Sequence, residues 1–161
     1  MGSSKSPGVL VIGVGNEMRG DDAVGLMVAR RLRRKLAGEA VILEEDGDGA
    51  HLVESWKGFN ETILVDAVRS GAQPGQIHRF EANKSQLPMG MIQCSTHGFS
   101  IPQAIELASA MNQLPSKLII YGIEGKCFDQ GEGISPNVEH AARKLVNLLA
   151  LEILQHRPLI T

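Results

Sequence analysis

Short apolar runs alternate with amphipathic segments along the whole chain, and this pattern predicts its secondary structure. Residues 9–14 form a continuous apolar run that stops in glycine, as expected of a strand buried on both faces. Residues 23–36 follow with apolar side chains at helical spacing. The same reasoning predicts strands at 41–43, 62–65, 76–80 and 118–123, and helices at 50–56, 101–111 and from Pro136 onward, with Ser135 as N-cap.

Strands and helices that alternate with short connections predict a parallel sheet covered by helices on both faces. We therefore expect an α/β fold, a three-layer α/β/α sandwich around a mostly parallel, twisted sheet of about five strands. A chain of 161 residues fits one domain, which we place at residues 8–161. Residues 1–7 are small, polar and without pattern, so we expect them to be disordered or a remnant of cloning.

Composition narrows the range of partners. The formal net charge of −2 gives no reason to expect binding to nucleic acid or to an anionic membrane surface. No apolar stretch is long enough to span a bilayer, and no hydrophobic signal region is visible. The two cysteines, Cys94 and Cys127, lack the spacing of a disulfide framework or a zinc site, which suits a reducing cytoplasm.

The loop after the first strand carries the first candidate chemistry. It contains Gly13, Gly15 and Asn16 and then two carboxylates, Asp21 and Asp22, where the next helix begins. The glycine spacing fits neither the dinucleotide nor the P-loop motif, and two carboxylates at a helix N-terminus would repel a phosphate. We expect Asp21 to cap the helix and Asp22 to have a function, such as holding a cation.

Two further candidates lie at other points of the same sheet edge, because sites in parallel sheets form beyond the carboxyl ends of the strands. Asp66 directly follows the apolar run 63–65, where a charge is costly unless it is paired, solvated or bound to metal. His97 directly precedes a predicted helix. Each residue alone also fits an ordinary structural role. Together Asp22, Asp66 and His97 form an oxygen and nitrogen set that suits a divalent transition metal with open coordination positions.

Six motifs together resemble the hydrogenase maturation endopeptidases. The first is the opening signature at 11–25, a strand followed by Gly-x-Gly-Asn, a short loop, Asp-Asp and an early helical glycine. The others are the acidic and glycine-rich segment 44–49, the Asp-Ala and Gly-x-x-Pro-Gly stretch at 64–75, Ser-Thr-His-Gly at 95–98, Gly-Ile-Glu at 122–124 and Ile-Ser-Pro at 134–136. One departure is the stretch 48–51, Asp-Gly-Ala-His, where the family more often has small residues.

The resemblance implies a function and assigns the site. It implies an endopeptidase that removes a C-terminal peptide from the large-subunit precursor of a nickel–iron hydrogenase after nickel insertion. It makes Asp22, Asp66 and His97 the metal-contacting and catalytic residues, with Gly13, Gly15, Asn16 and Asp21 as the supporting loop. The nickel would be supplied by the substrate, other divalent metals could occupy the site in vitro, and the enzyme would be a monomer.

The chemistry predicted from this site is metal-assisted hydrolysis. No Gly-x-Ser-x-Gly motif is present and neither cysteine has a nucleophile signature, which disfavours a covalent acyl-enzyme. A metal that polarises the scissile carbonyl or activates water, with a carboxylate as base, is the expected mechanism. Three other functions stay open: a nickel- or precursor-binding maturation factor that does not cut, a nucleotide-binding α/β domain, and a family member that processes a different metalloenzyme precursor.

Overall fold

A five-stranded sheet organises the computed structural model, which describes residues 8–84 and 101–155. Its strands are β1 (Val9–Val14), β2 (Val41–Glu45), β3 (Glu61–Val68), β4 (Ile77–Glu81) and β5 (Lys117–Glu124). The helices are α1 (Val24–Leu36), α2 (Gly49–Trp56), α3 (Ile101–Ala110) and α4 (Pro136–Gln155), and a short 3₁₀ helix, η1 (Gly20–Ala23), precedes α1. Every predicted strand and helix is present, with ends that differ by a few residues.

The strand order is β2-β1-β3-β5-β4. Strands β2, β1, β3 and β5 are parallel, and β4 pairs antiparallel with β5 at the edge. This confirms the expected α/β fold with a mostly parallel sheet. From β1 the chain moves outward to β2 and then returns to the other side of β1 to form β3. The carboxyl ends of β1 and β3 therefore flank a topological switch point, where open α/β sheets bind their ligands.

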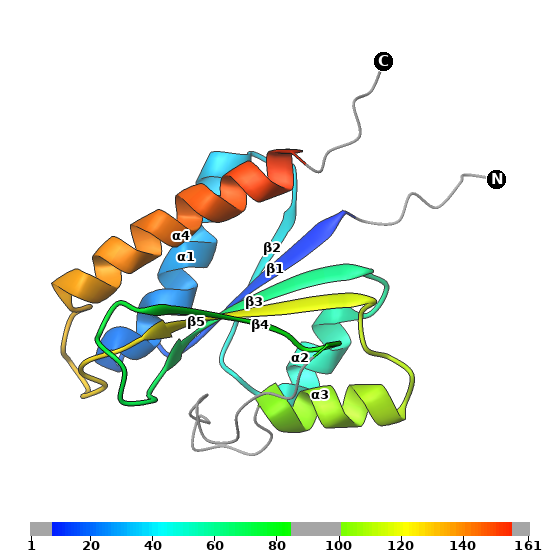
Figure 1. Ribbon diagram of the computed structural model, residues 1–161, viewed down its shortest axis with the longest axis horizontal. Helices are drawn as coiled ribbons and strands as arrows, with labels where there is room; N and C mark the ends of the chain where they lie inside the picture. Colours follow the sequence, from blue (N-terminus) through cyan, green and yellow to red (C-terminus); the bar gives the residue numbers. More distant parts are fainter. Residues whose placement is uncertain (1–7, 85–100, 156–161) are drawn as a thin grey trace.

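Helices cover both faces of the sheet, α1 and α4 on one and α2 and α3 on the other (Figure 1). Because successive strand side chains point to opposite faces, Ile63 and Val65 pack against the α1/α4 layer and Leu64 and Val68 against the α2/α3 layer. Trp56 is buried in the second layer. No helix within residues 8–84 or 101–155 has both the length and the apolar character needed to cross a membrane.

The start of α1 lies unusually close to the sheet. A Cβ atom on Gly25 would lie 2.3 Å from the carbonyl oxygen of Val14 and 2.4 Å from that of Val65. A Cβ atom on Gly13 would lie 2.2 Å from the carbonyl oxygen of Gly25. Glycine at both positions lets helix and strands touch through their backbones, which brings the loop before α1 to the carboxyl ends of β1 and β3.

Candidate active site

The loop between β1 and α1 presents Asp22 through a set of backbone contacts. The amide of Gly15 donates to the carbonyl oxygen of Glu45 at 3.0 Å, which ties the loop to β2. The amide of Asn16 donates to the Asp22 carboxylate at 3.1 Å. A Cβ atom on Gly15 would lie 2.0 Å from the Asp22 carbonyl oxygen, so a larger residue has no room there. Glycine and asparagine in this loop thus hold the half-buried Asp22 in place.

Asp66 does not end its strand as the sequence predicted. Strand β3 continues to Val68, because Asp66, Ala67 and Val68 pair with Gly122, Ile123 and Glu124 of β5. The pairing of β3 with β1, in contrast, stops at Val65. Asp66 is therefore the first residue of β3 beyond its pairing with β1, level in register with Val14, where β1 ends and the loop to α1 begins.

Burial raises the pKa of both Asp66 and Asp22, and repulsion from Asp22 raises that of Asp66 further. Asp66 is 4% exposed, and burial, followed by repulsion from Asp22, raises its pKa well above the ordinary value. Burial also raises the pKa of Asp22, although Arg19 and the Asn16 amide act in the opposite direction. One hydrogen bond reaches the Asp66 carboxylate from the described residues, from the amide of Ala67 at 2.8 Å. Two neighbouring carboxylates whose negative charge is stabilised by so few hydrogen bonds and positive charges are suited to binding a cation.

A groove of about 1010 Å³ opens beside Asp22. One wall is the loop at 15–19. The second is the acidic segment at the end of β2 and just after it, residues 44–48, and the third comes from residues 128–130. Its lining has seven carboxylates against two guanidinium groups, whereas the whole chain has a net charge of only −2. Negative charge is therefore concentrated at this groove, which favours cationic ligands over nucleotide phosphates.

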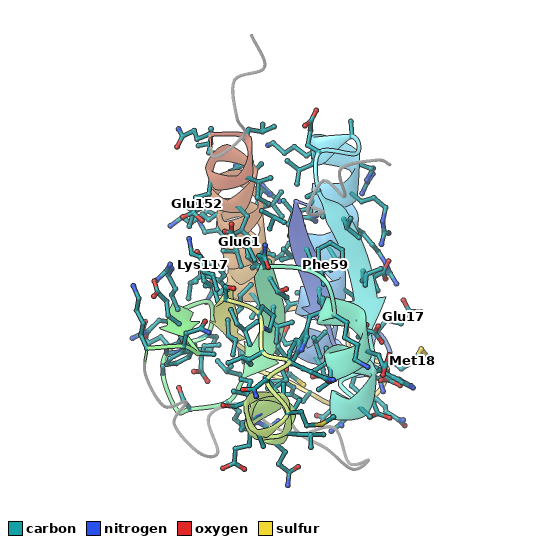
Figure 2. The ribbon with its side chains drawn as sticks, turned by 90° about the vertical axis from the view of Figure 1, so that its right-hand side faces the viewer. Glu17, Met18, Phe59, Glu61, Lys117 and Glu152 are labelled. Carbon is teal, nitrogen blue, oxygen red and sulfur yellow. The ribbon has the colours of Figure 1, made fainter. Side chains whose placement is uncertain are left out.

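Glu17 lines the groove, and its neighbour Met18 lies beside it in the same loop. Figure 2 shows both side chains at the periphery of the molecule, on the side of β2. Glu17 forms an ion pair with Arg30 at 2.8 Å, so this extra carboxylate of the loop is bound to a guanidinium group. Met18 is 66% exposed.

The third predicted site residue, His97, lies outside the described residues, as does Cys94. The chemistry of the donors that are described can be compared with that of a divalent cation. Asp22 and Asp66 offer carboxylate oxygens in a site with few competing donors, and such oxygens bind hard and borderline divalent metals. These two residues therefore fit a metal site that an imidazole would complete.

The sequence reasoning missed the contribution of the segment after β2. Glu45 and Asp46 line the groove, and their carboxylates lie within 4.8 Å of a ring nitrogen of His51. The signal was available, because the acidic and glycine-rich stretch at 44–49 directly follows a strand. Asp46 and His51 are exposed.

The prediction that Asp21 caps α1 was wrong. The N-cap position of α1 is Ala23 and receives no side-chain hydrogen bond. Asp21 is instead fully buried, and its carboxylate accepts hydrogen bonds from residues 126–135, more than a hundred positions away. Burial raises the pKa of Asp21, but hydrogen bonds from Cys127, Ser135 and Lys126 outweigh it, so the pKa lies below its ordinary value.

A third buried carboxylate, Glu124, fixes the turn between β3 and β4. It is 1% exposed and accepts hydrogen bonds from the amide and the hydroxyl of Ser70, and His78 lies 3.2 Å from it. Burial raises the pKa of Glu124, but the bonds from Ser70 and His78 outweigh it and lower the pKa below the usual value. The charge on Glu124 therefore stabilises the fold at neutral pH.

Replacing Glu124 by Gln should lower the melting temperature at pH 7. Loss of hydrogen bonds to a buried charge costs about 2 kcal/mol, or roughly 4–8 °C for a domain of this size. Because the pKa is lowered in the folded state, the difference from wild type should shrink as the pH falls below 4.5. Thermal unfolding from pH 3 to pH 8 measures both effects. Glu54→Gln, at an exposed ion pair with Lys57, is the control and should change little.

Comparison with known proteins identifies the family to which this chain belongs. The family model described as hydrogenase maturation protease matches residues 26–152. The chain belongs to the hydrogenase maturation protease family. The members of this family are proteases, and a maturation protease acts on a hydrogenase.

Similar proteins of the maturation protease family support the assignment. The crystal structure of a [NiFe] hydrogenase maturation protease HycI from Thermococcus kodakarensis KOD1 superposes with a TM-score of 0.72 at 27% identity, covering 95% of this chain and 96% of that one. The putative hydrogenase maturation protease MJ0253 of Methanocaldococcus jannaschii is 26% identical over 155 residues, which are 92% of this chain and 98% of the relative.

A third relative, the hydrogenase expression/formation protein HupD of Thiocapsa roseopersicina, is 24% identical over 151 residues, which are 92% of this chain and 68% of the relative. Two further HupD proteins are matched over 62% and 65% of their length. The chain thus spans about two thirds of the length of these HupD relatives.

Proposed function

We propose that this chain is a metal-dependent endopeptidase that removes a C-terminal peptide from the large-subunit precursor of a nickel–iron hydrogenase after nickel has been inserted. The observation that carries the proposal is the pair of carboxylates at the switch point, Asp22 and Asp66, in a member of the hydrogenase maturation protease family. The nickel is part of the substrate in this proposal, and other divalent metals can replace it in vitro. The reaction takes place in the cytoplasm between a monomeric enzyme and a transient partner.

The two carboxylates have different surroundings, which supports different roles. Asp22 lines the groove and Asp66 does not, so Asp22 reaches the peptide while Asp66 lies behind it. In our mechanism Asp66, Asp22 and His97 would hold the metal, which would supply Lewis-acid polarisation of the scissile carbonyl. Asp22 also accepts the proton of the attacking water through the carboxylate oxygen that the Asn16 amide does not occupy. The proton then passes to the leaving amine as the peptide bond breaks.

A precursor-processing assay tests the proposal. The protein is mixed with nickel-loaded large-subunit precursor, and a nickel-free precursor of the same sequence is the matched control. Intact mass spectrometry should show loss of a C-terminal peptide from the nickel-loaded precursor alone, because the metal completes the site only in the encounter complex. Equal cleavage of both precursors would contradict the role of nickel.

The same assay separates the alternatives. Binding to precursor without any mass change would favour a maturation factor that does not cut, and would remove the catalytic roles of Asp22 and Asp66. A nucleotide-binding domain would instead show a higher melting temperature with nucleotide. The concentration of carboxylates at the groove argues against that outcome.

A further inference from the structure

Asp21 joins two loops that are far apart in the sequence. Its Oδ2 atom accepts hydrogen bonds from the amides of Lys126 and Cys127 at 2.7 and 2.9 Å and from the Ser135 hydroxyl at 2.8 Å. Its Oδ1 atom accepts from the amide of Ser135 at 2.7 Å. One carboxylate therefore binds both ends of the connection between β5 and α4, residues 125–135.

Backbone contacts add to this attachment. The amide of Asp21 donates to the carbonyl oxygen of Cys127 at 2.8 Å. The amide of Gly131 donates to the carbonyl oxygen of Met18 at 3.1 Å. A Cβ atom on Gly20 would lie 2.5 Å from the Cys127 carbonyl oxygen, so the two loops touch through their backbones. The connection at 125–135 thus lies directly against the loop that carries Asp22.

The part of the connection between these anchors faces the groove. Phe128, Asp129 and Gln130 form its third wall, opposite the acidic segment after β2. The guanidinium group of Arg69 lies 4.3 Å from the centre of the Phe128 ring, which holds the wall from the sheet side. The position of this wall relative to Asp22 therefore depends on the residue next to Asp22 in the chain.

We propose that Asp21 is a positioning residue for the substrate: it holds residues 126–135 against the Asp22 loop, so that residues 128–130 contact the precursor peptide at a defined distance from Asp22. This inference rests on the proposed function. Asp21 itself is fully buried and touches no substrate. It acts through the wall, and its loss should weaken precursor binding more than it slows the chemical step.

Asp21→Asn tests the attachment with little change in shape. An asparagine keeps one acceptor oxygen and places an amide group where donors now point, since both carboxylate oxygens accept hydrogen bonds. Ser135→Ala is the milder variant, because it removes the hydroxyl donor and leaves the backbone amides that bind Asp21. Glu124→Gln is the matched control, since it weakens another buried, hydrogen-bonded carboxylate that does not line the groove.

The first measurement is amide hydrogen exchange. In Asp21→Asn the amides of Lys126, Cys127 and Ser135 should lose protection while those of β1 and β3 keep theirs. In Glu124→Gln the amide of Ser70 should respond instead. A global loss of protection in Asp21→Asn would mean that this variant cannot separate positioning from folding, and the milder Ser135→Ala then decides the kinetic comparison.

The second measurement is the dependence of cleavage on nickel-loaded precursor, well below every melting temperature. Because small misplacements of a binding wall have large effects, Asp21→Asn should raise KM about tenfold and change kcat less than about threefold. Ser135→Ala should raise KM two- to threefold, and Glu124→Gln less than about twofold. An unchanged KM in Asp21→Asn, or equal changes in Asp21→Asn and Glu124→Gln, would overturn the proposal.

Precursor binding measured by calorimetry keeps this test separate from the proposed function. If wild-type protein binds but does not cut, the endopeptidase proposal fails, while a weaker Kd for Asp21→Asn would still support the positioning role. If wild-type protein cuts and Asp21→Asn has the wild-type Kd and KM, the positioning role fails and the endopeptidase proposal stands.

Discussion

Replacing Asp66 by Asn is expected to abolish precursor cleavage and, at the same time, to raise the melting temperature of the metal-free protein. The carboxylate is 4% exposed and repelled by Asp22, so its charge destabilises the metal-free fold. The amide has nearly the same shape and no charge, but it is a poor ligand for a divalent cation. Activity should fall at least 10³-fold, the scale typical for loss of a group central to an active site.

The stability effect has a defined pH dependence. Because the pKa of Asp66 is raised in the folded state, the folded protein loses stability as the pH rises through and above the ordinary value of 3.8. Asp66→Asn removes this loss, so its advantage should be largest at neutral pH and should vanish near pH 3. An increase of roughly 2–4 °C corresponds to about 1 kcal/mol for a domain of this size.

Thermal unfolding in the presence of a chelator, from pH 3 to pH 8, measures this advantage. In separate samples without chelator, added nickel should raise the melting temperature of wild type more than that of Asp66→Asn, because a ligand stabilises the state that binds it. Glu54→Gln should change neither activity nor stability, since this exposed side chain forms a surface ion pair with Lys57. If Asp66→Asn cleaves at the wild-type rate, the assignment of Asp66 to the site is wrong.

Gly25→Ala should strongly destabilise the protein. Within a helix alanine is normally favoured over glycine by about 1 kcal/mol. Here the new Cβ atom would lie 2.3–2.4 Å from the carbonyl oxygens of Val14 and Val65, so α1 must move away from the sheet. We expect a net loss of about 3 kcal/mol, or roughly 6–12 °C in melting temperature.

Cleavage by Gly25→Ala should fall more than its stability alone explains, because a shift of α1 also moves Asp22 away from Asp66. Denaturant unfolding and the processing assay, both performed at low temperature, separate the two effects. Gly8→Ala is the control, since its Cβ atom would meet nothing within 4 Å. A Gly25→Ala protein as stable as Gly8→Ala would show that the helix can shift at no cost.

Much of the fold could be predicted from the sequence, because it depends on local patterns. Apolar runs and helical spacing predicted every strand and α-helix of the described residues, though not the 3₁₀ helix η1, and their alternation predicted the parallel sheet. The extra length of β3 could not be predicted. Asp66 stays in the strand because of its pairing with Gly122, more than fifty residues away, and no local pattern reports such a pairing.

The candidate site was predictable in part for the same reason. Asp22 and Asp66 could be selected because they follow apolar strands, and the structure places them at the switch point. The role of Asp21 was missed, because its partners begin at Lys126 and a helix start with an acidic residue usually indicates a cap. The buried position of Glu124 was missed as well, although a carboxylate that ends an apolar strand is a visible signal. The prediction for His97 lies on residues that the structure does not describe.

The strand order also has a consequence for the order in which the protein forms during synthesis. Strands β1, β2 and β3 lie within the first 68 residues and pair with one another, so they can associate early on the ribosome. Asp66, however, gains its strand pairing from β5, and Asp21 gains its hydrogen bonds from residues 126–135. A nascent chain from which Asp21 and Asp66 have already emerged therefore still lacks the contacts that hold these two residues in place. The contacts that position the site are thus completed only after β5 and residues 125–135 have been synthesised.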